Sequence, residues 1–323
     1  MQPTTLVEPA LLAQHLPGPD RPAVRAEPAH TDPAAPLAPA PAAASAVAHT
    51  VAPAAEWVVI DCRFDLARPD WGRQAHSQAR IPGALYAHLD HDLSGPVTPG
   101  SGRHPLPAPA ALEATFSRFG IDESVQVIAY DQGPGAYAAR LWWLLRWLGH
   151  SRVAVLNGGL AAWQQAGLPL SSGLPDAASR APRRFVARAP LAAAVSTPEL
   201  EQALPHIAAG RLLLVDARGA DRFRGENETL DPVAGHVPGA SNHPYMGNLD
   251  ATGRFLPPAG LRALWEERLG ARPASQLISM CGSGVTACHN LLALEAAGLP
   301  GAALYAGSWS EWIRDPARPV ARG

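Results

Sequence analysis

The chain has 323 residues and a formal net charge of −2; all 26 of its basic residues are arginine, and it contains three cysteines. The length predicts about two domains, and the lack of lysine excludes nucleotide hydrolysis through a Walker lysine and Schiff-base chemistry, including that of pyridoxal phosphate enzymes. The near-neutral charge argues against a nucleic-acid partner, and no apolar run approaches the ~18 residues that a membrane span needs.

An odd number of cysteines cannot form a complete disulfide framework. The first twenty residues contain no lysine or arginine, so they lack the positively charged start of a secretory signal. We therefore expect a cytoplasmic protein with no membrane partner.

The first predicted element is a helix that begins near Thr5, and a strongly biased segment follows it. Residues 17–55 contain 15 Ala and 9 Pro. Proline at this density disrupts both helices and strands, so we predict a disordered insert with helical turns only in its Ala-rich part.

Further along the chain, apolar strand-like runs alternate with helical runs, and the series occurs twice. The pairs that follow the insert lie about 150 residues apart. The matching segments are 5–12 with 195–200, 58–63 with 213–218, 81–84 with 237–240, 126–133 with 276–283, and 153–163 with 302–312.

A duplicated α/β domain explains this repetition, and such alternation is typical of a mostly parallel sheet with helices on both faces. We expect a first domain at residues 1–170 that includes the insert, a Pro/Ser/Ala-rich linker at 171–194, and a second domain at 195–323.

Parallel sheets bind ligands at the carboxyl ends of their strands, which here means the turns at Asp131 and Cys281. Cys281 begins the sequence Cys-Gly-Ser-Gly-Val-Thr-Ala, between a strand-like run and a helical run. Gly282 and Gly284 free the backbone to curl around the sulfur, and the N–H groups that open the helix favour an anion there. Helix N-termini also lower thiol pKa values, so we predict that Cys281 is a nucleophile rather than an inert buried cysteine.

The sequence resembles the tandem-domain rhodanese family, which includes mercaptopyruvate and thiosulfate sulfurtransferases, over nearly the whole chain outside the insert. The resemblance rests on Arg80-Ile-Pro-Gly-Ala-Leu, Tyr86-Ala-His-Leu-Asp, Gly235-His-Val-Pro-Gly-Ala, the Cys281 loop and Tyr305-Ala-Gly-Ser-Trp-Ser-Glu-Trp. It implies two rhodanese-like domains, of which the second is catalytic and the first has lost the nucleophile. Asp131 at the position of Cys281 agrees with this.

The resemblance also bears on the sulfur donor. Family members that prefer thiosulfate typically have Arg and Lys directly after the nucleophile, whereas mercaptopyruvate members have the sequence found here, Gly282, Ser283, Gly284, Val285 and Thr286. Gly282, Gly284, Val285 and Thr286 are candidates for donor binding. Ser283 is also a candidate catalytic residue, because its hydroxyl can hydrogen-bond the transferring sulfur or the substrate carbonyl.

A 2-oxo acid needs an anchor for its carboxylate, and arginine can bind a carboxylate through two hydrogen bonds. Arg222 matches a substrate-binding arginine of the family, and Arg224 is its neighbour. Mercaptopyruvate members usually have a second arginine further along this loop. The corresponding residues 226–231 are acidic here and contain no arginine. Arg80, where the family often has histidine, is a candidate to replace the missing charge.

The implied reaction has two steps and needs no cofactor or metal. Cys281 attacks the donor sulfur and becomes a persulfide, and a thiol, cyanide or a thioredoxin-like protein then accepts that sulfur. We expect a monomer. Cys288 and His289 lack the paired short spacings of a zinc site with Cys281.

Three alternatives remain open. A phosphatase would need arginine at the end of a Cys-x5-Arg loop, where this chain has Ala287. The protein could instead be a non-enzymatic sulfur carrier. It could also be a thiosulfate:cyanide sulfurtransferase, which the missing second arginine favours and the uncharged loop opposes.

Overall fold

The computed structural model describes residues 4–16, 56–173 and 180–323. The predicted disordered insert at 17–55 lies outside the described residues, as does part of the predicted linker. Within the described ranges, no helix is both long and apolar enough to cross a membrane.

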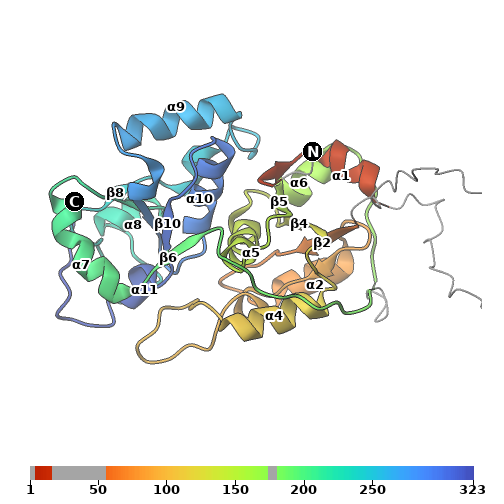
Figure 1. Cartoon of the computed structure of the whole chain (residues 1–323), viewed down its shortest axis with the longest axis horizontal. Coiled ribbons are helices and arrows are strands. Elements are labelled where there is room, and N and C mark those ends of the chain that lie inside the picture. The colour runs from red at the N-terminus through yellow and green to blue at the C-terminus, as the bar shows by residue number, and fades with distance from the viewer. Residues whose placement is uncertain (1–3, 17–55, 174–179) are drawn as a thin grey trace, which may run out of the picture.

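Two five-stranded parallel sheets form the framework (Figure 1). The first has the order β1-β5-β4-β2-β3, with β1 at Leu6–Val7, β2 at Trp57–Asp61, β3 at Leu85–Tyr86, β4 at Gln126–Tyr130 and β5 at Val153–Leu156. The second has the order β6-β10-β9-β7-β8, with β6 at Ala193–Val195, β7 at Leu213–Asp216, β8 at Ser241–Asn242, β9 at Leu277–Met280 and β10 at Ala303–Tyr305. The two orders are equivalent, which confirms the duplicated α/β fold.

Helices connect the strands in both copies. In the first copy they are α1 at Pro9–His15, α2 at Trp71–Gln78, α3 at Leu89–Asp92, α4 at Pro109–Arg118, α5 at Ala136–Trp147 and α6 at Gly159–Gln165. In the second they are α7 at Thr197–Ala208, α8 at Ala220–Arg224, α9 at Pro258–Leu269, α10 at Ala287–Ala296 and α11 at Ser308–Trp312, with 3-10 turns η1 at Tyr245–Asn248 and η2 at Ala274–Gln276.

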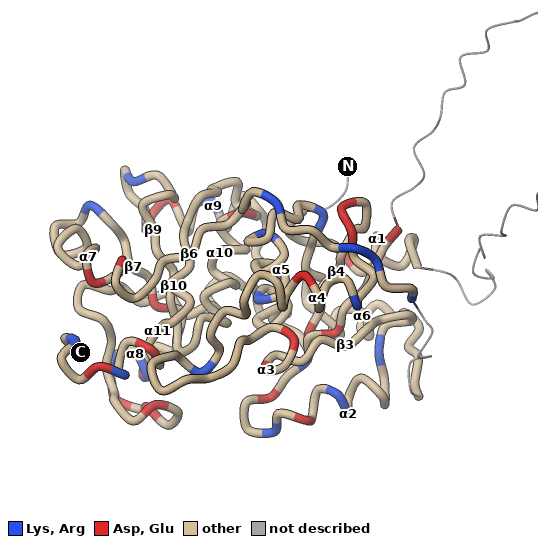
Figure 2. The backbone as a smooth tube through the Cα atoms, turned by 60° about the horizontal axis from the view of Figure 1, so that its bottom comes forward, with Lys and Arg blue, Asp and Glu red and all other residues tan. Residues whose placement is uncertain are grey.

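Successive residues of a strand point to opposite faces of the sheet, and in each sheet both faces are buried. In β2, Val58 and Ile60 belong to the core that contains α5, whereas Val59 packs on the other face with Leu12 of α1 and Trp163 of α6. Charged residues of both signs are distributed along both copies (Figure 2).

Local sequence signals explain where elements begin. Helix α7 starts with a capping box in which the Ser196 hydroxyl accepts from the Glu199 N–H and the Glu199 carboxylate accepts from the Ser196 N–H. Strand β6 begins at Ala193, one residue before the end of the predicted linker, and pairs in parallel with β10.

The two copies share one hydrophobic core, in which α5 packs against α10. A buried polar network also joins them. His289 on α10 bonds through Nε2 to the Pro134 carbonyl at 2.8 Å, and Asn248 donates to His289 Nδ1 at 3.2 Å. His243 in turn bonds to the Asn248 carbonyl oxygen at 3.0 Å. Because α5 and α10 follow β4 and β9, this interface brings the turns at Asp131 and Cys281 to the same region.

Candidate active site

The Cys281 loop curls over its own sulfur at the end of β9. The thiol is 2% exposed, and the Gly284 N–H donates to Sγ at 3.2 Å. Gly284 has φ +76°, and a Cβ there would lie 2.3 Å from the Ala306 carbonyl oxygen. Glycine alone tolerates this positive φ and has no side chain to clash with the Ala306 carbonyl. This is the physical basis of the predicted role of Gly284 in shaping the loop.

Helix α11 holds the loop from behind. Ser308 has φ +54°, and its hydroxyl accepts from the Cys281 N–H at 3.0 Å while donating to the Tyr305 carbonyl at 2.9 Å. The first copy has Gly159 at the corresponding place, with φ +56°. Ser308 thus fixes the backbone of Cys281 from a conformation that side chains rarely adopt.

The equivalent loop of the first copy encloses an anion of its own. The buried carboxylate of Asp131 accepts hydrogen bonds from the backbone N–H groups of Gly133, Gly135, Tyr137 and Ala138, at 2.9 to 3.4 Å. Burial raises the pKa of Asp131, and these four bonds oppose that effect. In this first-copy loop, four backbone N–H groups therefore point at a negative charge. That charge occupies the position that Cys281 has in the second copy.

A Ser283–His104–Asp90 chain crosses the domain interface beside the sulfur. Ser283 Oγ lies 2.7 Å from His104 Nδ1, and His104 Nε2 lies 3.3 Å from Asp90 Oδ1. Burial lowers the pKa of His104, although Asp90 opposes the shift. In the neutral ring, Nε2 carries the hydrogen toward the carboxylate, so Nδ1 accepts from the Ser283 hydroxyl.

Sequence reasoning missed both His104 and Asp90. His104 lies in the loop between α3 and α4, within a Ser-Gly-Arg-His-Pro segment that has no helical or strand periodicity. An adjacent arginine and histidine in a Gly- and Pro-rich loop was the available signal, because loops often carry functional residues.

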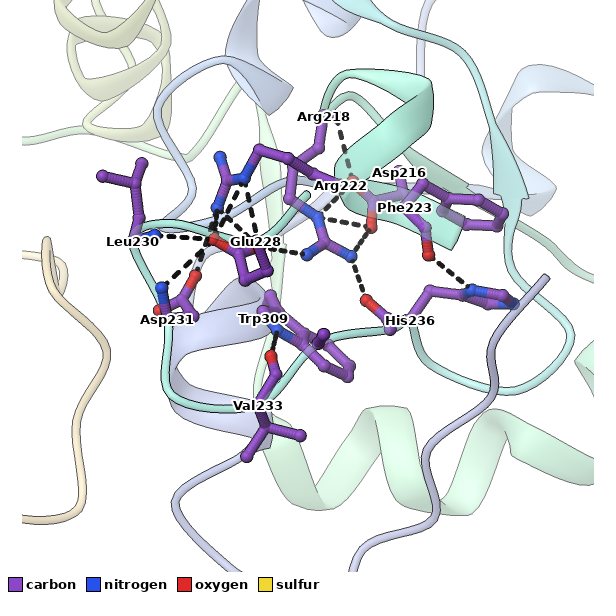
Figure 3. Close-up of polar contacts among 12 residues, drawn as sticks. Asp216, Arg218, Arg222, Phe223, Glu228, Leu230, Asp231, Val233, His236 and Trp309 are labelled. Carbon is purple, nitrogen blue, oxygen red and sulfur yellow. Dashed lines mark hydrogen bonds and ion pairs between the residues drawn. The ribbon is translucent and has the colours of Figure 1, made fainter. Parts of the chain in front are cut away.

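Arg218 and Arg222 pair with the carboxylates of Asp216, Glu228 and Asp231 (Figure 3). Arg222 donates to both oxygens of Glu228 through Nε and Nη2, at 2.8 to 3.1 Å, and to Asp231 at 3.3 Å. Arg103 comes from the first copy and donates to the other oxygen of Asp231. The side chains of Glu228 and Asp231 are only 2% and 3% exposed.

The neighbouring Arg218 also contacts Glu228, at 3.4 Å, and its other contacts support the fold. It donates to both oxygens of Asp216 and, at 2.7 Å, to the Gly235 carbonyl, and its guanidinium lies 4.9 Å from the centre of the Trp309 ring. Arg63 repeats the carboxylate contact with Asp61 in the first copy. The arginine–aspartate pair that follows this strand is thus a feature of the repeated fold.

Helix α5 supports the site from the first copy. The fully buried guanidinium of Arg140 donates to the carbonyls of Gly284 and His104, each at 3.1 Å, and to that of Leu93 at 3.4 Å. Cys288 donates its thiol hydrogen to the Gly284 carbonyl at 3.3 Å, and burial raises its pKa to about 12. Cys288 therefore packs as an un-ionised thiol.

A cavity of about 130 Å³ joins these groups. Of the predicted site residues, six line it: Cys281, Gly282, Ser283, Val285, Thr286 and Arg222. Gly284 contributes its N–H to the sulfur from behind.

The other two predicted arginines lie elsewhere. Arg224 is paired with Glu226 on the exposed side of α8. Arg80 is buried, and its guanidinium donates to the carbonyls of Gly173 at 2.5 Å and His76 at 3.3 Å. The structure does not bring either one to the cavity; Arg103 is the first-copy arginine that reaches it. No cluster of three or more potential metal ligands occurs in the described ranges.

The family model for the rhodanese-like domain matches the chain twice, at residues 48–166 and 199–315. This chain belongs to the rhodanese family. The predicted family and fold class are thereby confirmed, and the cavity of this rhodanese lies between its two copies.

Relatives of this rhodanese carry names of both donor types. A Pseudomonas aeruginosa protein named "Probable 3-mercaptopyruvate sulfurtransferase" is 49% identical over 268 residues, covering 82% of this chain and 92% of that protein. The thiosulfate sulfurtransferase of Rattus norvegicus is 34% identical over 249 residues, covering 75% and 80%. The solved structure of 3-mercaptopyruvate sulfurtransferase from Leishmania major matches with a TM-score of 0.71 and 32% identity, over 81% of this chain and 72% of that one.

Proposed function

We propose that this sulfurtransferase takes its sulfur from 3-mercaptopyruvate and carries it as a persulfide on Cys281. One observation carries the proposal: Cys281 lines a cavity that also holds the Ser283–His104 pair and three arginines. A nucleophile, a proton carrier and a carboxylate anchor therefore surround one space of small-molecule size.

The donor choice follows from the chemistry of the loop. Gly282 and Ser283 place no positive charge next to the sulfur, whereas a 2-oxo acid presents a carbonyl that a hydroxyl can hydrogen-bond. The similarity to 3-mercaptopyruvate sulfurtransferases supports the same donor. The cations that thiosulfate would use are present in Arg103 and Arg222, but buried carboxylates pair with them.

In the first step, the Cys281 thiolate attacks the donor sulfur, an S–S bond forms, and the C–S bond breaks. The bonding electrons leave with pyruvate as its enolate. The proton of the donor thiol ends on pyruvate, and the Ser283–His104 pair is placed to give a proton to the enolate and take one back from the persulfide. Loop amides hold the negative terminal sulfur, as their counterparts hold Asp131 in the first copy.

In the second step, a thiol, cyanide or a thioredoxin-like protein attacks the terminal sulfur and restores the thiolate. This cycle balances without a cofactor. A cytoplasmic location and a monomeric state stay predictions from the sequence.

The decisive experiment measures thiocyanate formation with 3-mercaptopyruvate and with thiosulfate in parallel, for wild type, Cys281→Ser and the control Cys62→Ala. We expect kcat/KM to favour mercaptopyruvate at least tenfold, or about 1.4 kcal/mol of transition-state binding. Cys281→Ser should be inactive and Cys62→Ala active. A tenfold preference for thiosulfate would reverse the donor assignment, and turnover with neither donor would favour a sulfur carrier.

A further inference from the structure

Arg140 on α5 is a buried cation that has no carboxylate partner. Its side chain is fully buried, and its guanidinium donates to the carbonyls of Leu93, His104 and Gly284. Among the described residues it forms no ion pair with an aspartate or glutamate. Asp131, the nearest acidic residue along the chain, accepts instead from four backbone N–H groups. Because an isolated buried charge is costly, a negative charge that forms near Arg140 is strongly stabilised.

Two thiols lie within electrostatic reach of this guanidinium, those of Cys288 and Cys281. Burial raises the pKa of Cys288 to about 12, so this thiol stays neutral near pH 7. Gly284 connects Arg140 with the other thiol. Its carbonyl accepts from Arg140 Nη1 at 3.1 Å, and its N–H donates to Cys281 Sγ at 3.2 Å. Of the two thiols, Cys281 is therefore the one that can become negative near pH 7.

The other charges around the cavity already have partners. Among these residues, Arg103, Arg218 and Arg222 pair with Asp216, Glu228 and Asp231, and Glu311 on α11 accepts from Thr197. Burial lowers the pKa of His104 and raises those of Tyr137 and Tyr245, so these three side chains are neutral near pH 7. In the described part of the chain, Arg140 is thus the cation beside the nucleophile loop that no carboxylate balances.

The repeated fold does not account for this arginine. The turn of α10 that corresponds to Arg140 carries His289 and Asn290. Burial lowers the pKa of His289 to about 3, so neither residue is charged near pH 7. Arg63 and Arg218, by contrast, form the same aspartate contact in both copies. Arg140 therefore belongs to the copy that faces the Cys281 loop rather than to the repeat.

We propose that Arg140 supplies the positive charge that balances the Cys281 sulfur when this sulfur is negative, first as a thiolate and then as a persulfide. Arg140 acts across Gly284, in a region inaccessible to solvent where charges attract strongly. It is a positioning residue, because it binds the loop and not the reacting atoms. The persulfide part of the inference rests on the proposed function, whereas the thiolate part does not.

Alkylation of Cys281 by iodoacetamide tests the thiolate, because the thiolate is the form that reacts. Mass spectrometry measures the adduct between pH 5 and 9. In Arg140→Gln, whose amide can still donate to a carbonyl, the pH of half-maximal alkylation should rise by about one unit, which is a tenfold smaller thiolate fraction at lower pH. Arg140→Lys keeps the charge and loses the planar fork, so it should recover at least half of this shift.

Arg80→Gln is the matched control. Arg80 is also buried and donates to carbonyls, but it lies away from the cavity, so the variant should alkylate as wild type does. Equal shifts in Arg140→Gln and Arg140→Lys would show that lost packing, and not lost charge, is responsible. Either that result or an unchanged midpoint in Arg140→Gln would overturn the proposal.

A second comparison leaves Arg140 in place and measures stability instead of reactivity. Cys281→Asp puts a carboxylate where the first copy has Asp131, and Cys281→Asn has the same size without the charge. The aspartate variant should have the higher thermal midpoint at pH 7, and Arg140→Gln should at least halve the difference between the two. Equal midpoints for the aspartate and asparagine variants, or a difference that Arg140→Gln leaves intact, would contradict the proposed charge balance.

Turnover separates this inference from the proposed function. With 3-mercaptopyruvate, Arg140→Gln should lower kcat/KM at least tenfold and reduce the persulfide found on Cys281 by mass spectrometry. If wild type formed no persulfide with either donor, the proposed function would fail. The alkylation and stability comparisons would still decide whether Arg140 balances the charge of the sulfur.

Discussion

The Ser283 hydroxyl lies between a neutral imidazole and the space that the donor would occupy. Its partner His104 belongs to the other copy, so the proposed proton carrier forms only when the two copies are packed together. Asp90 orients the imidazole of His104. A carboxylate only accepts hydrogen bonds, so the ring nitrogen that faces it, Nε2, carries the hydrogen.

His104→Gln should lower kcat for mercaptopyruvate about 100-fold, the usual size of a general acid–base contribution, and change KM little. Burial lowers the pKa of His104 below its ordinary value of about 6.5, so the neutral form persists in mildly acidic solution. Activity should fall only as the pH drops through this lowered pKa, because imidazolium cannot accept the Ser283 hydrogen.

A kcat/KM profile between pH 4 and 8 checks this prediction, with the exposed His91→Gln as the control. If the acidic limb were the same in His104→Gln as in wild type, the limb would belong to another group.

The sequence predicted residues near Cys281 better than residues that face it from the other copy. The Gly-rich turn after a buried strand indicates a loop around an anion, so Cys281, Ser283 and Gly284 could be predicted. His104 and Arg103 come from a loop almost 180 residues earlier in the chain. Their closeness to Ser283 depends on how two domains pack, and local pattern carries no information about that.

Arg80 illustrates the same limit. Its position before Ile-Pro-Gly suggested a functional charge, but the guanidinium bonds to the carbonyls of His76 and of Gly173 in the predicted linker. An arginine in a repeated motif can stabilise the fold or contribute to the site. Where its guanidinium points in the folded chain decides between these roles.

At the level of elements, the catalytic loop is fixed from three sides. Helix α11 bonds to its first residue, α5 bonds to the Gly284 carbonyl through Arg140, and α10 continues its backbone. The repeated order of strands made this strand–loop–helix unit predictable, because both copies share the same topology.

Gly284→Ala should lower the thermal midpoint by about 2 °C or more, because the new Cβ meets the Ala306 backbone and the residue must keep φ +76°. Persulfide formation should fall with it, since the Gly284 N–H bonds to the sulfur.

Gly133→Ala is the matched control in the first-copy loop, because its Cβ would meet no atom within 4 Å. Thermal denaturation and mass spectrometry of the persulfide measure the two effects. Equal midpoints for the two variants would contradict the steric argument.

At the scale of the whole molecule, the buried histidines at the interface make folding sensitive to acid. Burial lowers the pKa of His289 to about 3 and that of His243 to about 4. The unfolded chain binds these protons near pH 6.5 and the folded chain does not, so stability is lost as the pH falls from 6.5 toward these values.

Calorimetry between pH 4 and 7.5 should therefore show a falling midpoint, with a shallower slope for His289→Gln. That variant keeps an amide hydrogen for the Pro134 carbonyl and removes one titrating group. The exposed His206→Gln should keep the slope of wild type, and an identical slope in His289→Gln would contradict the prediction.

Asp131 has a consequence for how the molecule works over time. A carboxylate is permanent, whereas in the proposed reaction the sulfur on Cys281 arrives and departs in every cycle. The first copy thus holds a fixed anion where the proposed persulfide would carry its charge. We therefore expect Cys281 to be loaded and unloaded without a large rearrangement of its loop, whose first-copy counterpart already surrounds an anion.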